Sequence, residues 1–139
     1  MGSQAAEYLL IFTETTPERY EAMSREELEQ ALGRWNAWCD ELAALGRLRA
    51  GNTLAPVART VSARGRTTVV DGPFTETKEL IAGYMLITAA SFDEATEIAR
   101  TCPNLATGMV VEVRPVARAC HLARALGWET MRGPAARPA

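Results

Sequence analysis

The order of strand-like and helix-like segments is the feature of this sequence that most restricts its fold. Residues 8–12 form a continuous apolar run, which is typical of a strand buried on both faces. Ser24 and Glu27 then form a capping box, which predicts the start of a helix that Gly46 ends. Residues 47–54 follow as a second strand. The helix carries apolar residues at spacings of four and three on one face, predicted to be buried: Leu28, Leu32, Trp35, Cys39 and Leu42, with Trp38 at the flank.

A strand, a helix and a strand also follow one another in the second half of the chain. Residues 80–88 and 109–116 both alternate in the manner of strands. Between them, Ser91 with Glu94 predicts a second capping box and helix start. The buried stripe of this helix is predicted to be Phe92, Ala95, Ile98, Ala99 and Cys102.

Residues 58–63 and 66–70 predict a β-hairpin between these two halves. The complete order is that of a ferredoxin-like α+β fold with an inserted β-hairpin. Both helices pack on one face of the sheet in this arrangement, so the other face needs cover. We therefore expect a homodimer with back-to-back sheets, because large exposed apolar patches are uncommon on monomers.

The densest group of polar residues lies in the corner after this hairpin. A β-branched run stops at Asp71, and Gly72 with Pro73 makes a rigid turn between two strands. Asp71 is either a catalytic base that can also orient a substrate, or an acceptor for backbone N–H groups of its own turn. Phe74 and Lys78 follow directly, and we predict that both bind substrate in a cleft beside Asp71.

Four residues on other elements are predicted to complete this cleft. Tyr84 is a candidate catalytic residue whose hydroxyl can donate to a developing oxyanion, with a core or interface tyrosine as the alternative. Glu112 and Arg114 share a strand face. They form either an ion pair at the dimer seam or a site in which Arg114 binds an anionic substrate. Trp35 either belongs to the buried helix stripe or stacks on an aromatic ligand.

Composition argues against several classes of protein. The 139 residues suit one main domain, and a net charge of −2 without a basic stripe argues against nucleic acid as a partner. No apolar run approaches the roughly 18 residues that span a bilayer, so we expect no membrane partner. Three cysteines cannot all pair within one chain, which favours a cytoplasmic protein with reduced thiols.

The C-terminal part of the chain differs in character from the rest. We assign residues 1–116 to the main domain and residues 117–139 to a helical extension with a tail predicted to be disordered. His121 lies there beside Cys120, and adjacent residues rarely converge on one metal ion. With no zinc motif, phosphate loop or dinucleotide fingerprint in the sequence, we expect no metal and no cofactor.

An ordered series of motifs from residue 8 to residue 116 resembles one known family. The motifs are Tyr8-Leu-Leu-Ile-Phe12, Leu45-Gly46-Arg47-Leu48, Gly51, Asp71-Gly72-Pro73-Phe74, Thr75-Glu76-Thr77-Lys78-Glu79, Gly83-Tyr84, Phe92-Asp93-Glu94-Ala95 and Val111-Glu112-Val113-Arg114-Pro115-Val116. Together they are similar to the DGPF-domain branch of the YCII-related family, which is named after the tetrapeptide at residues 71–74.

The resemblance implies a ferredoxin-like fold of the dimeric α/β-barrel type, with sheets that meet at the dimer interface and clefts beside it. It does not imply one reaction, because the family includes small-molecule enzymes, uncharacterised proteins and genes beside alternative sigma factors. Better-studied relatives are thought to use a His on the first helix and an Asp before the last strand. Those positions fall near Trp35 and on Cys102 here, so any chemistry must use other residues.

These observations lead to one expected function and two alternatives. We expect a cofactor-independent enzyme that acts on a small carbonyl-bearing or aromatic metabolite by acid–base chemistry, of the lyase, isomerase or cyclase type. The first alternative is a non-catalytic small-molecule binder. The second is a sigma-factor-associated regulatory protein.

The variant Asp71→Asn separates the two roles of Asp71. If the carboxylate is a base, we expect turnover to fall roughly 10²-fold or more, with the melting temperature almost unchanged. If Asp71 only stabilises its turn, the melting temperature falls and turnover per folded molecule stays the same. Both quantities are to be measured on one preparation, and full activity in a destabilised variant ends the catalytic assignment.

Overall fold

The computed structural model describes residues 5–59, 61, 63 and 80–134. Asp71, Phe74, Lys78 and most of the predicted hairpin lie outside these residues, as does the end of the predicted C-terminal tail. The elements in chain order are β1 (Ala6–Glu14), η1 (Pro17–Ala22), α1 (Arg25–Ala44), β2 (Leu48–Thr53), β3 (Leu80–Ala89), α2 (Phe92–Arg100), η2 (Pro103–Thr107), β4 (Val110–Pro115) and α3 (His121–Ala125).

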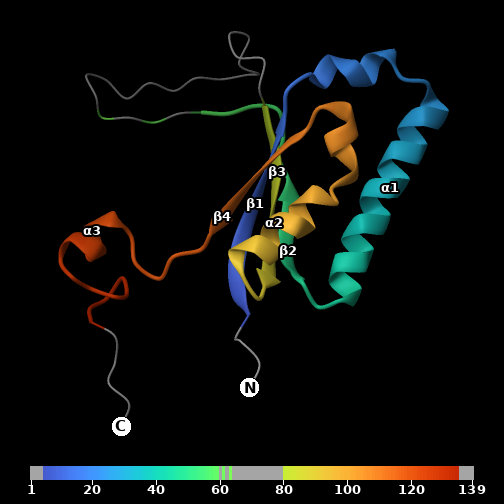
Figure 1. Cartoon of the computed structure of the whole chain (residues 1–139). Coiled ribbons are helices and arrows are strands. Elements are labelled where there is room, and N and C mark those ends of the chain that lie inside the picture. Colours follow the sequence, from blue (N-terminus) through green and yellow to red (C-terminus); the bar gives the residue numbers. More distant parts are fainter. Residues whose placement is uncertain (1–4, 60, 62, 64–79, 135–139) are drawn as a thin grey trace.

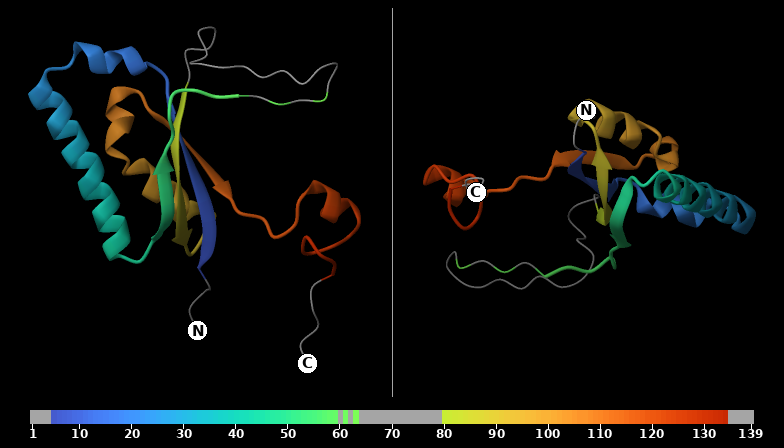
Figure 2. Two further views of the ribbon diagram at one scale, coloured as in Figure 1. Left: turned by 180° about the vertical axis from the view of Figure 1, so that it is seen from behind. Right: turned by 90° about the horizontal axis from the view of Figure 1, so that it is seen from below.

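The four strands form one antiparallel sheet in the order β2-β3-β1-β4. This α+β arrangement is consistent with the ferredoxin-like fold predicted from the sequence. Both α1 and α2 lie on one side of the sheet (Figures 1 and 2). Of the predicted hairpin's first strand, the described residues 58, 59, 61 and 63 are not in a strand.

Alternation along the strands divides the sheet into two faces. On β1, Tyr8, Leu10 and Phe12 are buried toward the helices, while Leu9 and Ile11 are half-buried on the opposite face. On β3, Met85, Ile87 and Ala89 are buried with them. Ala95, Ala99 and Cys102, from α2 and its end, complete the core beneath the second helix, as predicted.

Both helix starts are capped by serine, but only the first has a complete capping box. Ser24 Oγ accepts from Glu27 N, and the Glu27 carboxylate accepts from Ser24 N. Ser91 Oγ accepts from Glu94 N at 3.0 Å. The predicted return bond is absent, because the Glu94 carboxylate instead accepts from Ala90 N and pairs with Arg47.

The predicted buried stripe of α1 is only partly correct. Leu42 is buried, but so is Trp38, which the periodicity had placed at the flank, with 6% of its surface exposed. Leu32, by contrast, is 60% exposed, and Leu28 is also exposed. Only the C-terminal half of the stripe packs tightly, since the N-terminal half extends over a hollow described below. The predicted burial of Phe92 on α2 is also wrong, because it lies at the rim of the core against Tyr8.

The C-terminal segment makes few contacts with the rest of the described chain. Its helix, α3, is shorter than the predicted helical extension and lies apart from the sheet (Figures 1 and 2). Ala119 and Ala123 are buried within this segment, whereas Leu122 and Leu126 are exposed.

Gly83 shows why a glycine is needed where β3 lies against β2. A Cβ added at Gly83 would lie 2.7 Å from Asn52 O, which is backbone and cannot rotate away. We expect Gly83→Ala to lower the free energy of unfolding by about 1–3 kcal/mol, the usual cost of overpacking. Urea denaturation measures this change.

Gly33 provides a matched control for this substitution. It is exposed in the interior of α1, and an added Cβ would meet nothing within 4 Å. Gly33→Ala should therefore raise the free energy of unfolding by about 0.8–1 kcal/mol through helix propensity alone. A loss of stability in both variants would contradict the steric explanation.

Candidate ligand-binding site

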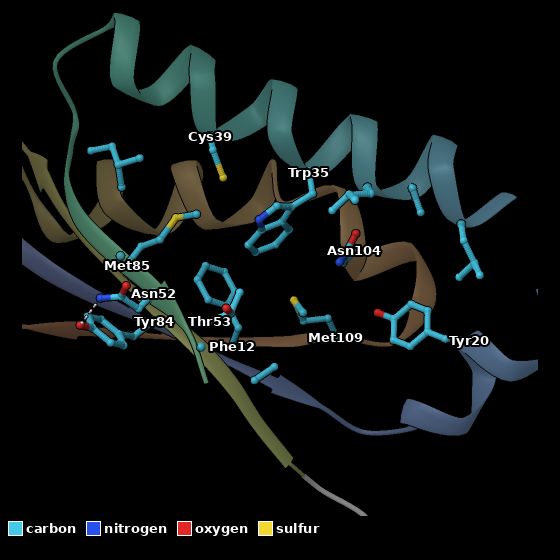
Figure 3. A pocket seen from close by; sticks show the side chains of 17 residues that line it. Phe12, Tyr20, Trp35, Cys39, Asn52, Thr53, Tyr84, Met85, Asn104 and Met109 are labelled. Atoms are coloured by element: carbon cyan, nitrogen blue, oxygen red, sulfur yellow. Dashed lines mark hydrogen bonds between the residues drawn. The ribbon is translucent and has the colours of Figure 1, made fainter. Parts of the chain in front are cut away.

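A largely apolar pocket of about 540 Å³ lies between α1 and the helix-covered face of the sheet (Figure 3). Leu28, Ala31, Leu32, Trp35 and Cys39 form its wall on the side of α1. These residues include most of the apolar stripe recognised in the sequence, so the stripe faces a cavity along half its length. That position explains why its leucines remain exposed.

An aromatic cluster forms the inner end of this wall. Trp35 and Trp38 are one helical turn apart, and both rings meet Phe12 edge-on, with centroids 5.0 and 6.1 Å from the Phe12 ring. Trp38 Nε1 donates to Thr101 Oγ1 at 2.8 Å, which ties α1 to the end of α2. Phe12 and Trp38 are buried, while Trp35 is half-buried and faces the pocket.

Two glycines keep the floor of the pocket open. Gly51 on β2 and Gly83 on β3 line it, together with Met85. A Cβ at Gly51 would come within 3.2 Å of Met85 Cγ. The strands can therefore pair closely here, and no side chain of either glycine occupies the space under α1.

Tyr20 and Asn104 supply polar groups at the far end of the pocket, beside Met109 (Figure 3). The Tyr20 hydroxyl donates to Glu14 Oε1 at 3.0 Å. Glu14 is 9% exposed because it continues the inward-facing row of β1. Burial, the bond to Glu14 and the negative charge of Glu14 raise the pKa of Tyr20 to about 12, although Thr107 and Arg19 act in the opposite direction.

The thiols nearby are held in their neutral form. Burial is the main cause that raises the pKa of Cys39, which lines the pocket, and of Cys102, which is buried against Met109. A neutral thiol is a poor nucleophile. Neither thiol is therefore suited to attacking a ligand. The other groups of the pocket, Tyr20, Asn104 and the indole of Trp35, are suited to binding one.

The structure brings two of the residues that the sequence grouped in one cleft, Trp35 and Tyr84, to the lining of the pocket, whereas Glu112 and Arg114 are not part of it. The Tyr84 side chain belongs to the opposite face of β3 from Met85, and its hydroxyl accepts from Asn52 Nδ2 at 2.9 Å at the pocket's margin. Glu112 and Arg114 lie on that same opposite face, exposed and paired at 3.5 Å. Their predicted roles in a ligand site stay predictions, as do those of Asp71, Phe74 and Lys78, which lie outside the described residues.

Three polar residues at this end of the pocket, Glu14, Tyr20 and Asn104, were missed by sequence reasoning. The signal for Glu14 was present, because the alternation of Tyr8, Leu10 and Phe12 puts the next inward position on a carboxylate. Tyr20 gave no comparable signal. Its position depends on how η1 folds back over the end of β1.

Metal-binding clusters and membrane-spanning helices are both absent from the described part of the chain. Across residues 5–59, 61, 63 and 80–134, no three His, Cys, Asp or Glu side chains are grouped to hold a metal ion. No helix in these ranges is long and apolar enough to cross a membrane.

The raised pKa of Tyr20 predicts how stability depends on pH. The folded protein holds the phenolic proton more tightly than the unfolded chain, in which the ordinary pKa is 10.0. This contribution to stability is complete below about pH 10 and is lost as pH rises toward 12. We expect the free energy of unfolding to fall more steeply with pH in this window for wild type than for Tyr20→Phe. Urea denaturation at fixed pH measures both slopes, and equal slopes would contradict the assignment.

Comparison with known protein sequences identifies the family of this chain. The sequence pattern of the YCII-related domain matches residues 8–119. An uncharacterised protein of Rhizobium meliloti (strain 1021) is 40% identical over 101 residues, which cover 69% of this chain and 81% of that protein. The match to the domain covers most of the chain, and the chain therefore belongs to the YCII-related family.

Proposed function

We propose that this protein binds a small, mostly apolar aromatic metabolite in the pocket between α1 and the sheet. The observation that carries this proposal is the pocket itself: about 540 Å³, an aromatic inner wall and a few polar groups at one end. Ligand pockets are commonly of this size and composition. A metabolite of one or two rings fits this description.

The size of the apolar surface sets the expected affinity. Burying an aromatic group of about 150–250 Å² contributes roughly 4–6 kcal/mol. That range corresponds to dissociation constants from about 1 mM to tens of micromolar. Tighter binding would require the polar end of the pocket, where Tyr20 and Asn104 lie.

Catalysis in the same pocket is the second candidate function. It would be cofactor-independent acid–base chemistry of the lyase, isomerase or cyclase type on a carbonyl-bearing or aromatic metabolite. The observation that favours it is the bond from Tyr20 to the buried Glu14. A proton passing from a ligand to the Tyr20 oxygen is matched by the phenolic proton passing to Glu14, so charge does not build up on the phenol. Turnover in Tyr20→Phe and Asp71→Asn then distinguishes the two candidate bases.

A bulky side chain in the pocket tests the binding proposal. Ala31 lines the cavity on α1, so Ala31→Phe should fill part of it and weaken binding of a bicyclic aromatic probe at least 10-fold. The control is Ala37→Phe, at an exposed position on the same helix outside the pocket. Isothermal titration calorimetry measures both affinities, and equal effects of the two substitutions would reject the pocket as the site.

We also propose a homodimer that forms through the sheet face opposite the helices. Leu9, Ile11 and Leu86 lie half-buried side by side there, with Glu112 and Arg114 toward the β4 edge. A second copy would bury this apolar centre. We propose two further properties of the protein. Its three free cysteines support a cytoplasmic location. The tetrapeptide at residues 71–74 supports membership of the DGPF branch of the family.

A charge at the centre of this face should prevent the dimer. We expect Leu86→Arg to convert the protein to a monomer in sedimentation at micromolar concentration. Leu45→Arg, at an exposed position after α1, should leave the assembly unchanged. Wild type that sediments as a stable monomer would rule out the dimer.

A further inference from the structure

At the polar end of the pocket, the Tyr20 hydroxyl can accept a hydrogen bond from a ligand but has no proton left to donate to one. The one proton of the Tyr20 hydroxyl is donated to Glu14 Oε1 at 3.0 Å. The phenol oxygen therefore offers its lone pairs, and no proton, to a molecule in the pocket. Figure 3 shows this hydroxyl directed toward Met109 and Asn104.

Neighbouring groups keep the Tyr20 proton in place. Glu14 is nine-tenths buried, and its carboxylate can only accept while it is ionised. Thr107 approaches the phenol oxygen, but its hydroxyl donates to the Asn104 backbone carbonyl at 2.9 Å. Arg19 contributes a positive charge nearby, yet its effect on Tyr20 is smaller than that of Glu14. The side-chain amide of Asn104 adds a donor and an acceptor to the same end.

We propose that this end of the pocket selects a neutral hydroxyl group on an aromatic ligand, a phenol or enol, whose O–H donates to the Tyr20 oxygen. The Asn104 amide is placed to donate to the same ligand oxygen. A carboxylate has no proton to donate and would lie near the buried charge of Glu14, so it is rejected. An ether cannot donate either and loses this bond. This inference rests on the proposed binding function and specifies its ligand class.

Three probes of the same ring size test this selectivity: 2-naphthol, 2-methoxynaphthalene and 2-naphthoate at pH 7. We expect wild type to bind 2-naphthol about 10-fold more tightly than the ether. That factor is the usual contribution of one hydrogen bond to an acceptor that is itself bonded to a charged group. The carboxylate should bind least. Tyr20→Phe should lower the affinity for 2-naphthol to that for the ether while leaving the ether within about 2-fold of wild type. Calorimetry supplies all the constants.

Glu14→Gln should raise the affinity for a carboxylate instead of lowering the affinity for a hydroxyl. The side-chain amide that this substitution introduces can donate to the phenol oxygen, which frees the Tyr20 proton to point into the pocket and removes the negative charge. We expect 2-naphthoate to bind at least 10-fold more tightly to this variant than to wild type. Tyr20→Phe remains the decisive variant if Glu14→Gln does not fold, as judged by circular dichroism.

The outcomes distinguish the hydroxyl selectivity from the proposed binding of an aromatic metabolite, on which it rests. Equal binding of 2-naphthol and the ether, or an equal loss of both in Tyr20→Phe, would overturn the hydroxyl selectivity and leave the aromatic pocket intact. Failure of all three probes to bind wild type would overturn both. Ala31→Phe weakens every probe if the pocket is the site, whatever the head group.

Discussion

The inward-facing row of β1 is the constraint on which the rest of the structure depends. β1 pairs with β3 on one side and β4 on the other, so alternate residues must enter the space beneath the helices. Tyr8, Leu10 and Phe12 fill that space, and the same period of two delivers Glu14 at its end. A buried carboxylate needs a donor. The donor is the Tyr20 hydroxyl. The inward-facing residues of β1 therefore form both the core and, through Glu14, the polar end of the pocket.

The hollow under α1 follows from where that helix is held. Trp38 and Leu42 pack into the core, and the bond from Trp38 to Thr101 fixes the helix against the end of α2. The first half of the helix then spans two strands whose facing residues, Gly51 and Gly83, supply no side chains. Apolar surface left in water in this way carries a cost of roughly 25 cal/mol per Å², which a bound apolar molecule would recover. Stability of the free protein is lower because the site is open.

The two faces of the sheet are suited to different interactions. The helix-covered face holds the pocket, with Trp35 at its wall. The opposite face carries a half-buried apolar centre and the exposed pair of Glu112 and Arg114. A side chain on one face cannot reach the other through the sheet. Residues that share a strand, such as Leu10 and Ile11, therefore belong to different surfaces although they are adjacent in sequence.

The sequence by itself determined the order of the four described strands and two main helices, and the starts of α1 and α2. Both are local properties: Ser24 and Ser91 cap backbone N–H groups three residues away, and strand alternation needs no distant partner. Only the tertiary structure decided which part of the α1 stripe is buried, because that depends on the shape of the sheet beneath it. It also decided that Glu94 would pair with Arg47 and accept from Ala90 N rather than from Ser91 N, and that Tyr20 would meet Glu14. These contacts join segments whose separation is set by packing, and no periodicity along the chain specifies them.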